Sequence, residues 1–125
     1  MKKGILAITT FLGGLAVVIG ALAAHALKSK LSAHDLDNVH TAVLYQMMHV
    51  LAILGMAAIP FLSAKDKNRI AGLFLTGILF FSGSIYLISI FGVNAGSIWF
   101  ITPLGGLLFI TGWFYAFWKI FRSKN

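Results

Sequence analysis

Four long apolar runs with almost no charge occupy most of the 125-residue chain, at about residues 5–27, 39–62, 70–93 and 98–118. A helix rises about 1.5 Å per residue, so roughly 20 apolar residues span the hydrocarbon core of a bilayer. Hydrophobic residues make up 59% of the sequence and charged residues 10%, which would leave a soluble domain with a very large exposed apolar surface. The sequence therefore predicts an all-α membrane protein. We expect one domain over residues 1–125, an antiparallel bundle of four transmembrane helices.

The ten Lys and Arg residues lie at the ends of these runs rather than along one exposed face. The side that would hold both termini and the second loop has Lys2, Lys3, Lys65, Lys67, Arg69, Lys119, Arg122 and Lys124. The other side has Lys28 and Lys30. By the positive-inside rule, both termini are expected in the cytoplasm. Topology and contact with anionic headgroups thus explain the net charge of +7, and no nucleic-acid partner is expected because that would require a clustered basic face.

The N-terminus also resembles a secretory signal peptide. Two lysines precede an apolar run, and Ala24, His25 and Ala26 match a small-x-small cleavage pattern. The run continues for more than about 20 residues before Lys28, whereas the core of a signal peptide has about 7 to 15. An uncleaved first span is the favoured interpretation, and cleavage is the alternative.

Local signals predict where the second helix begins and ends. Ser32 and Asp35 resemble a capping box, which places the start of the helix outside the lipid. Pro60 ends the helical signal near Ile59. Residues 63–68 form a short, polar and basic loop, so the second and third helices are expected to form an antiparallel hairpin.

Small residues within the spans predict faces where helix backbones approach each other closely. In the first helix, Ala16, Gly20 and Ala24 recur every four residues. The same packing role is predicted for Gly83, Gly105, Gly106 and Gly112. These glycines lie inside apolar spans rather than at a strand-to-helix turn, so they do not indicate a phosphate-binding loop.

Polar side chains inside the spans are the candidate functional residues, because each raises the free energy in lipid unless it meets a partner or water. On the second helix, Tyr45 and His49 share one stripe, with Gln46 at its margin. On the third helix, Ser82 and Tyr86 form a second stripe. Antiparallel topology brings these groups to similar depths. The predicted polar cluster, in the outer half of the bundle, consists of His25, Tyr45, Gln46, His49, Ser82, Tyr86 and Thr102.

Three interpretations of this cluster stay open. The first is an interhelical hydrogen-bond network that sets helix register, with under about 1 to 2 kcal/mol for each bond in a membrane. The second is a cavity for a small ligand, proton or lipid headgroup. The third is a haem or metal site, in which His25 and His49 would face each other from adjacent helices. No carboxylate lies inside a span and the chain has no cysteine, so we expect no metal, no cofactor and no enzyme activity.

Five motifs carry a family resemblance. They are GALAAHAL at 20–27, YQMMH at 45–49, FSGSIY at 81–86, TPLGG at 102–106 and GW at 112–113. In this order they resemble the small uncharacterised membrane protein family of YgdD and YwdK, domain of unknown function 423. The resemblance covers nearly the whole chain and implies a four-span protein of the bacterial cytoplasmic membrane, without an established activity, cofactor or ligand. One departure is Leu22-Ala23, which stands where the family has an aromatic residue and a glycine.

The resemblance also marks the family-type polar positions. These are His25, Tyr45, Gln46, His49, Ser82, Ser84 and Thr102. Our leading hypothesis is a small multi-pass membrane protein that acts as a non-catalytic interaction or membrane-supporting component. Its expected partners are the lipid bilayer and either further copies of the chain or another membrane protein. The alternatives are a small oligomeric carrier or channel that uses the polar cluster, and a haem- or metal-binding redox subunit.

Overall fold

The computed structural model describes residues 1–124, and all of the regular structure in this range is helical. The helices are α1 Lys3–Ala24, α2 Ala33–Ala58, α3 Ala64–Ser89, α4 Ala95–Ile98 and α5 Ile101–Arg122. The four long helices α1, α2, α3 and α5 are each long and apolar enough to cross a membrane. The predicted fold class, an all-α protein with four membrane-spanning helices, is confirmed.

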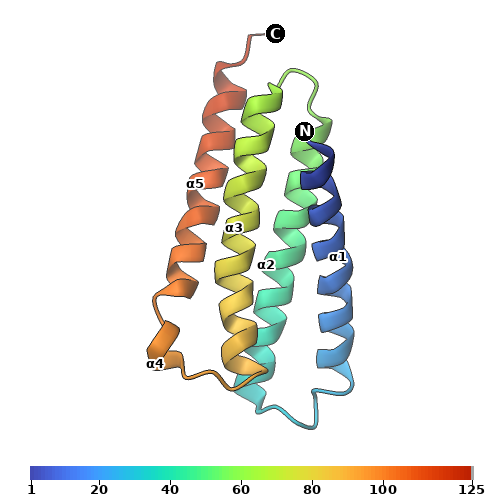
Figure 1. Ribbon diagram of the computed structural model, residues 1–125, viewed down its shortest axis with the longest axis vertical. Coiled ribbons are helices and arrows are strands. Elements are labelled where there is room, and N and C mark those ends of the chain that lie inside the picture. Colours follow the sequence, from blue (N-terminus) through green and yellow to red (C-terminus); the bar gives the residue numbers. More distant parts are fainter. Residues whose placement is uncertain (125) are drawn as a thin grey trace.

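The four long helices lie side by side in the order α1, α2, α3 and α5 (Figure 1). Both termini and the α2–α3 connection lie at one end, and the α1–α2 connection and α4 lie at the other. The helix α2 packs against α1 and α3, while α5 packs along α3, so α1 and α5 form the two edges. The arrangement is therefore closer to a layer than to a closed ring. A buried polar group on α2 lies within reach of partners on both of its neighbours.

Serine caps begin both central helices. The hydroxyl of Ser32 accepts the backbone N–H of Asp35 at 3.1 Å, as the sequence predicts for the start of α2. The hydroxyl of Ser63 accepts the N–H of Asp66 at 3.1 Å in the same way. The helix α3 therefore begins at Ala64, within the stretch that we expected to be a loop. The spacing of Ser63 and Asp66 repeats the capping pattern at Ser32 and offered the signal for this earlier start.

The last apolar run, expected as one helix from about residue 98, is divided in the structure. The side chain of Asn94 accepts the N–H of Gly96 at 2.9 Å and begins the short helix α4. The chain turns at Trp99 and Phe100 before α5 begins. Pro103 lies in the first turn of α5, where the missing N–H would have no partner within the helix.

Glycines bring α3 and α5 together. A side-chain carbon at Gly105 would lie 2.3 Å from the backbone nitrogen of Phe81, and one at Gly112 would lie 2.5 Å from a phenylalanine ring of α3. The two helices can pack at this distance because these positions carry no side chain. At Gly83 and Gly106, in contrast, an added carbon would meet nothing within 4 Å. The predicted packing role therefore does not hold for Gly83 and Gly106 within the chain.

The small residues of α1 follow the expected face only in part. Ala16 is fully buried, and a side-chain carbon at Gly20 would lie 3.5 Å from Val43 of α2. Ala24 is exposed, contrary to the predicted packing role, and Ala23 is buried in its place. A four-residue spacing advances about 40° around a helix at each step, so the third member leaves the face that contacts α2. A seven-residue spacing from Ala16 keeps Ala23 on it.

Candidate functional site

Buried polar side chains gather along α2 and α3. Gln46, His49, Ser82 and Ser84 are each no more than 2% exposed. Toward the start of α2 the polar face that includes Tyr45 and His49 continues to Thr41, which is exposed and whose hydroxyl donates to a carbonyl of its own helix. The buried members are therefore the part of the stripe that depends on other helices.

Gln46 joins three helices. Its side-chain N–H donates to the backbone carbonyl oxygen of Leu12 in α1 at 2.7 Å, and its side-chain oxygen accepts the hydroxyl of Tyr86 in α3 at 2.7 Å. A carbonyl oxygen has two lone pairs, so Leu12 can accept this bond in addition to its helical one. Both ends of the carboxamide are paired in a setting where an unpaired amide would be strongly unfavourable. Gln46 thus fixes α2 relative to α1 and α3.

Both ring nitrogens of His49 also have partners. Nδ1 lies 2.7 Å from the backbone carbonyl oxygen of Tyr45, and Nε2 lies 3.0 Å from the indole nitrogen of Trp113 in α5. A carbonyl oxygen only accepts and an indole N–H only donates, so the proton resides on Nδ1 and Nε2 is the acceptor. This pairing describes a neutral imidazole. It also occupies the nitrogen lone pair that a metal or haem iron would need.

Aromatic rings enclose the imidazole of His49. The ring of Phe109 stacks on it with centroids 3.6 Å apart and planes 9° apart. The ring of Phe74 meets it edge-on at 5.0 Å, and Trp113 lies at 6.0 Å. The groove beside this group has a volume of about 300 Å³ and is lined mainly by aromatic and aliphatic side chains. Apolar walls of this kind favour the neutral, fully paired state of the histidine.

Of the three buried serines of α3, Ser82, Ser84 and Ser89, the first two bind different neighbours. The hydroxyl of Ser82 donates to the backbone carbonyl oxygen of Ala42 in α2 at 2.7 Å. The hydroxyl of Ser84 is hydrogen-bonded to that of Thr102 in the first turn of α5. Ser82 therefore links α3 to α2, whereas Ser84 links α3 to α5. The predicted cluster is thus divided into several separate pairs rather than one continuous site.

The two histidines proposed as facing ligands do not meet. His25 is exposed at the end of α1. The bond between Gln46 and Leu12 fixes the register of α1 and α2, and His49 lies one turn beyond Gln46 on the side away from the end that holds His25. Thirteen residues from Leu12 to His25 correspond to about 20 Å along a helix. Within residues 1–124, no group of three or more His, Asp or Glu side chains could hold a metal ion.

Tyr45 differs from the other predicted members because its side chain is 37% exposed. Its ring packs on Phe81 with centroids 4.8 Å apart and lies 6.2 Å from that of Phe109. Tyr45 contributes to the buried network through its backbone carbonyl, which accepts from His49. The sequence indicates the position of Tyr45, but the group that binds His49 there is the backbone carbonyl and not the phenol hydroxyl.

One further polar group, which the sequence pattern does not indicate, lies at the basic end of the layer. Asp66 accepts the hydroxyl of Tyr115 at 2.6 Å and that of Ser63 at 2.7 Å, and it forms an ion pair with Lys119 at 3.1 Å. Asp66 lies in the first turn of α3, ahead of the apolar segment that begins near Ile70. The Tyr115 hydroxyl, followed by that of Ser63, lowers the pKa of Asp66 from its usual value to about 2. This cluster joins the basic ends of α3 and α5.

Comparison with known proteins places these residues in a family. The family model described as "Protein of unknown function (DUF423)" matches residues 19–106. A UPF0382 membrane protein of Haemophilus influenzae is 40% identical over 129 aligned residues, which cover 100% of this chain and 99% of that relative. The chain belongs to the DUF423 family. The resemblance inferred from the five sequence motifs is thereby confirmed.

Other DUF423 relatives support the same membrane location. The UPF0382 membrane protein YwdK of Bacillus subtilis is 38% identical over 79% of this chain and 80% of its own length. The UPF0382 inner membrane protein YgdD of Escherichia coli is 33% identical over 81% of this chain and 76% of its own. No solved structure matches the chain. With four helices able to span a membrane, this DUF423 protein is a multi-pass protein of the bacterial cytoplasmic membrane, as predicted.

Proposed function

We propose that this DUF423 protein is a non-catalytic interaction or membrane-supporting component of the cytoplasmic membrane, in which the interior polar groups fix the packing of the helices. The observation that carries this proposal is the pairing of Gln46. Its carboxamide uses both ends on neighbouring helices, at 2.7 Å each. A side chain that served a passing ligand would have to be reachable by it, whereas Gln46 is 1% exposed and both its nitrogen and its oxygen are bonded to neighbouring helices.

Two other interior groups, Ser82 and His49, support the same function. Ser82 donates to a backbone carbonyl of α2, and His49 is bonded through both ring nitrogens. A general base or a metal ligand needs an available lone pair, and in His49 the indole of Trp113 takes it. This pairing argues against the redox alternative. Hydrolytic catalysis is disfavoured as well. It would need a carboxylate to orient the imidazole, and in this chain a backbone carbonyl holds Nδ1 of His49 instead.

A carrier or channel requires a different interior. The polar groups of a channel would line a continuous space open to water on both sides, and those of a carrier would line a space open to one side at a time. The pairs formed by Gln46, His49 and Ser84 instead lie in separate contacts between helices, and the groove beside His49 has apolar walls. A path through one copy of the chain is therefore not favoured.

We infer that both termini are cytoplasmic and that the bilayer is the main partner. The basic residues at the end with both termini and the α2–α3 connection outnumber those at the other end, where Lys28 and Lys30 lie. The edge helices present large apolar side chains outward, such as Phe11 of α1 at 69% and Phe114 of α5 at 70% exposed. Lipid, a second copy or another membrane protein can cover these edges.

Cysteine accessibility tests the proposed function directly, because the natural chain has no cysteine. Single variants Gln46→Cys, His49→Cys and Ser82→Cys would be treated in membrane vesicles with a small, charged thiol reagent applied from each side. We expect no labelling at these three positions. Leu79→Cys, on the lipid-facing surface at 66% exposed, should also resist the reagent, while Ser29→Cys in the exposed first connection should react.

The outcome separates the function classes. Labelling at two or more of the three interior positions, with Leu79→Cys still protected, would contradict the proposal and favour a water-filled path. Each variant would first be checked for thermal stability in mild detergent, because a loosened fold would also admit the reagent. Ser82→Cys is the mildest change, since a thiol has nearly the shape of the hydroxyl that it replaces.

A further inference from the structure

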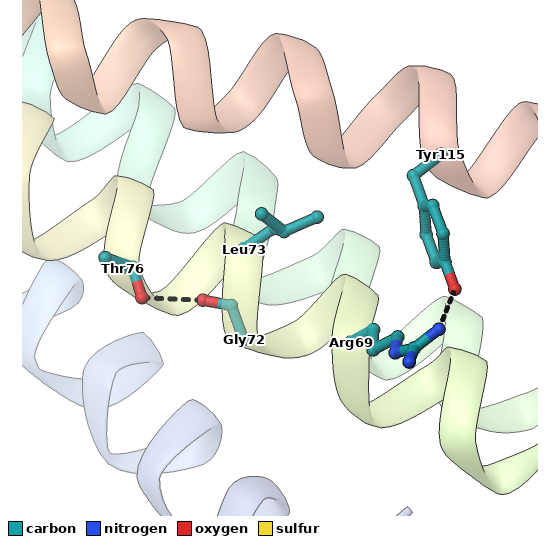
Figure 2. A pocket seen from close by; sticks show the side chains of 5 residues that line it. All are labelled: Arg69, Gly72, Leu73, Thr76 and Tyr115. Atoms are coloured by element: carbon teal, nitrogen blue, oxygen red, sulfur yellow. Dashed lines mark hydrogen bonds between the residues drawn. The ribbon is translucent and has the colours of Figure 1, made fainter.

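A groove lies on the membrane-facing surface between α3 and α5, close to the basic end of the layer. Its volume is about 450 Å³, and it is lined by Arg69, Gly72, Leu73, Thr76 and Tyr115. Figure 2 shows these side chains, with Arg69 and Tyr115 toward one end of the groove and Thr76 toward the other. The groove therefore combines a cationic mouth with a largely apolar body.

One stripe of α3 supplies three of the residues that line the groove, Arg69, Gly72 and Thr76, and Lys65 lies one turn before them. Lys65, Arg69, Gly72 and Thr76 recur at intervals of three or four residues and so share one helix face. A side-chain carbon at Gly72 would meet nothing within 4 Å, so the floor of the groove is open. The hydroxyl of Thr76 donates to the backbone carbonyl of Gly72 at 2.8 Å and needs no partner from an occupant. Two cationic positions are thus followed by two small ones that can lie against an alkyl chain.

The charge at the mouth is available to an anion. Arg69 is exposed, and its single hydrogen bond among the described residues is a donation to the hydroxyl of Tyr115 at 3.3 Å. The nearby carboxylate of Asp66 is already bound by Tyr115, Ser63 and Lys119. A guanidinium has five N–H donors in a planar fork that matches a phosphate group, so most of the donors of Arg69 remain free.

We propose that this groove binds one anionic phospholipid, with its phosphate at Arg69 and one acyl chain along Gly72 and Thr76. The proposal goes beyond the packing role of the interior polar groups and rests on different residues. Charge complementarity selects the occupant, because the mouth is cationic and lies at the end where the basic residues gather. At a membrane surface, one such residue strengthens the binding of anionic lipid by about fivefold.

Native mass spectrometry of the full chain in mild detergent tests this site. The protein would be given equal amounts of phosphatidylglycerol and phosphatidylcholine with the same acyl chains. We expect one phosphatidylglycerol to be retained in preference, and Arg69→Gln to weaken this retention by about fivefold. Gly72→Leu, which fills the groove and keeps the charge, should weaken it by at least as much. Thr76→Leu is a second filling variant, should Gly72→Leu fold poorly.

Two control variants match these changes. Lys28→Gln removes the same charge at the opposite end, and Gly55→Leu adds the same side chain at another exposed glycine with open surroundings. Both should retain phosphatidylglycerol as the natural chain does. Equal retention of the two lipids, or unchanged retention in Arg69→Gln, would overturn the proposal. Unchanged retention in both Gly72→Leu and Thr76→Leu would also overturn it, because headgroup attraction alone would then account for the binding. None of these outcomes depends on water access to Gln46, so this proposal and the proposed function can fail separately.

Discussion

Trp113 of α5 donates its indole N–H to Nε2 of His49 in α2 at 3.0 Å, and this bond joins two helices whose backbones both pack on α3. The indole fixes the imidazole as the neutral Nδ1–H form, and Phe109 stacks on the same ring. The contact draws α2, α3 and α5 together at one point. It also uses the only lone pair through which the histidine could bind an ion.

Removal of the indole donor is expected to destabilise the protein. Trp113→Phe keeps an aromatic ring at this position, but Nε2 of His49 loses its hydrogen-bond donor. We expect the free energy of unfolding to fall by about 1 to 2 kcal/mol, measured by reversible unfolding in mixed micelles. Trp118→Phe is the matched control, because Trp118 is similarly exposed on the same helix and its indole donates no hydrogen bond among the described residues. Equal effects of the two variants would contradict the structural role of the bond.

Two adjacent glycines of α5 provide a test of the α3–α5 packing. Gly105→Ala would place a methyl group 2.3 Å from the backbone nitrogen of Phe81, and backbone cannot move aside as a flexible side chain can. We expect a loss of about 1 to 3 kcal/mol in stability. Gly106→Ala meets nothing within 4 Å and should change stability by less than about 0.5 kcal/mol. Similar melting temperatures for both variants would refute the close contact.

The cluster around Asp66 predicts an acid-dependent stability. The folded pKa of Asp66, about 2, lies below its ordinary value near 3.8, so the carboxylate contributes stability above the ordinary value. This contribution is lost as the pH falls from about 4 toward 2, when the unfolded and then the folded form take up a proton. Because the group lies near the surface, we expect less than about 1 kcal/mol.

Asp66→Asn isolates this effect. The variant should show a smaller fall in melting temperature between pH 5 and about pH 2.5 than the natural chain does. Asp37→Asn, an exposed position of α2, is the control and should retain the natural pH profile. An equal fall in the melting temperature of Asp66→Asn and of the natural chain between pH 5 and about pH 2.5 would contradict this account. The contacts of Asp66 with the two hydroxyls and Lys119 would then not stabilise the folded protein.

The topology inferred from the basic residues is tested with reporter fusions. Alkaline phosphatase, which is active only outside the cytoplasm, should be active when fused at Ser29 and inactive when fused after Lys124. A fluorescent protein that matures in the cytoplasm should give the reverse pattern. Activity of the phosphatase at the C-terminus would show that the basic end lies outside.

The sequence predicts the main elements of this fold because their signals are local. Apolar length alone marks the four spans, and the pair Ser32 and Asp35 marks the start of α2. The second capping pair, Ser63 and Asp66, is less clear in the sequence, because the lysines next to it give the segment the polar, basic composition of a loop. The break before α5 depends on the turn at Trp99, in a stretch whose apolar character continues without interruption.

The pairing of the polar residues could be predicted only in part. The apolar spans indicate that Gln46, His49 and Ser82 lie inside the membrane. Periodicity indicates that each falls on a helix face with other polar residues. It does not identify partners that are backbone carbonyls, such as that of Leu12, because every residue has one. Periodicity also does not identify Trp113 as the partner of His49, since an indole is equally suited to the aromatic belt at a membrane interface.

A double-mutant cycle on Gln46 and Tyr86 tests the central claim most directly, namely that the interior polar groups hold the helices together. The free energy of unfolding in mixed micelles would be measured for the natural chain, Gln46→Leu, Tyr86→Phe and the double variant. The hydrogen bond of 2.7 Å predicts a coupling energy of about 1 kcal/mol between the two positions. A coupling energy within about 0.3 kcal/mol of zero would contradict the account, because the two side chains would then act independently.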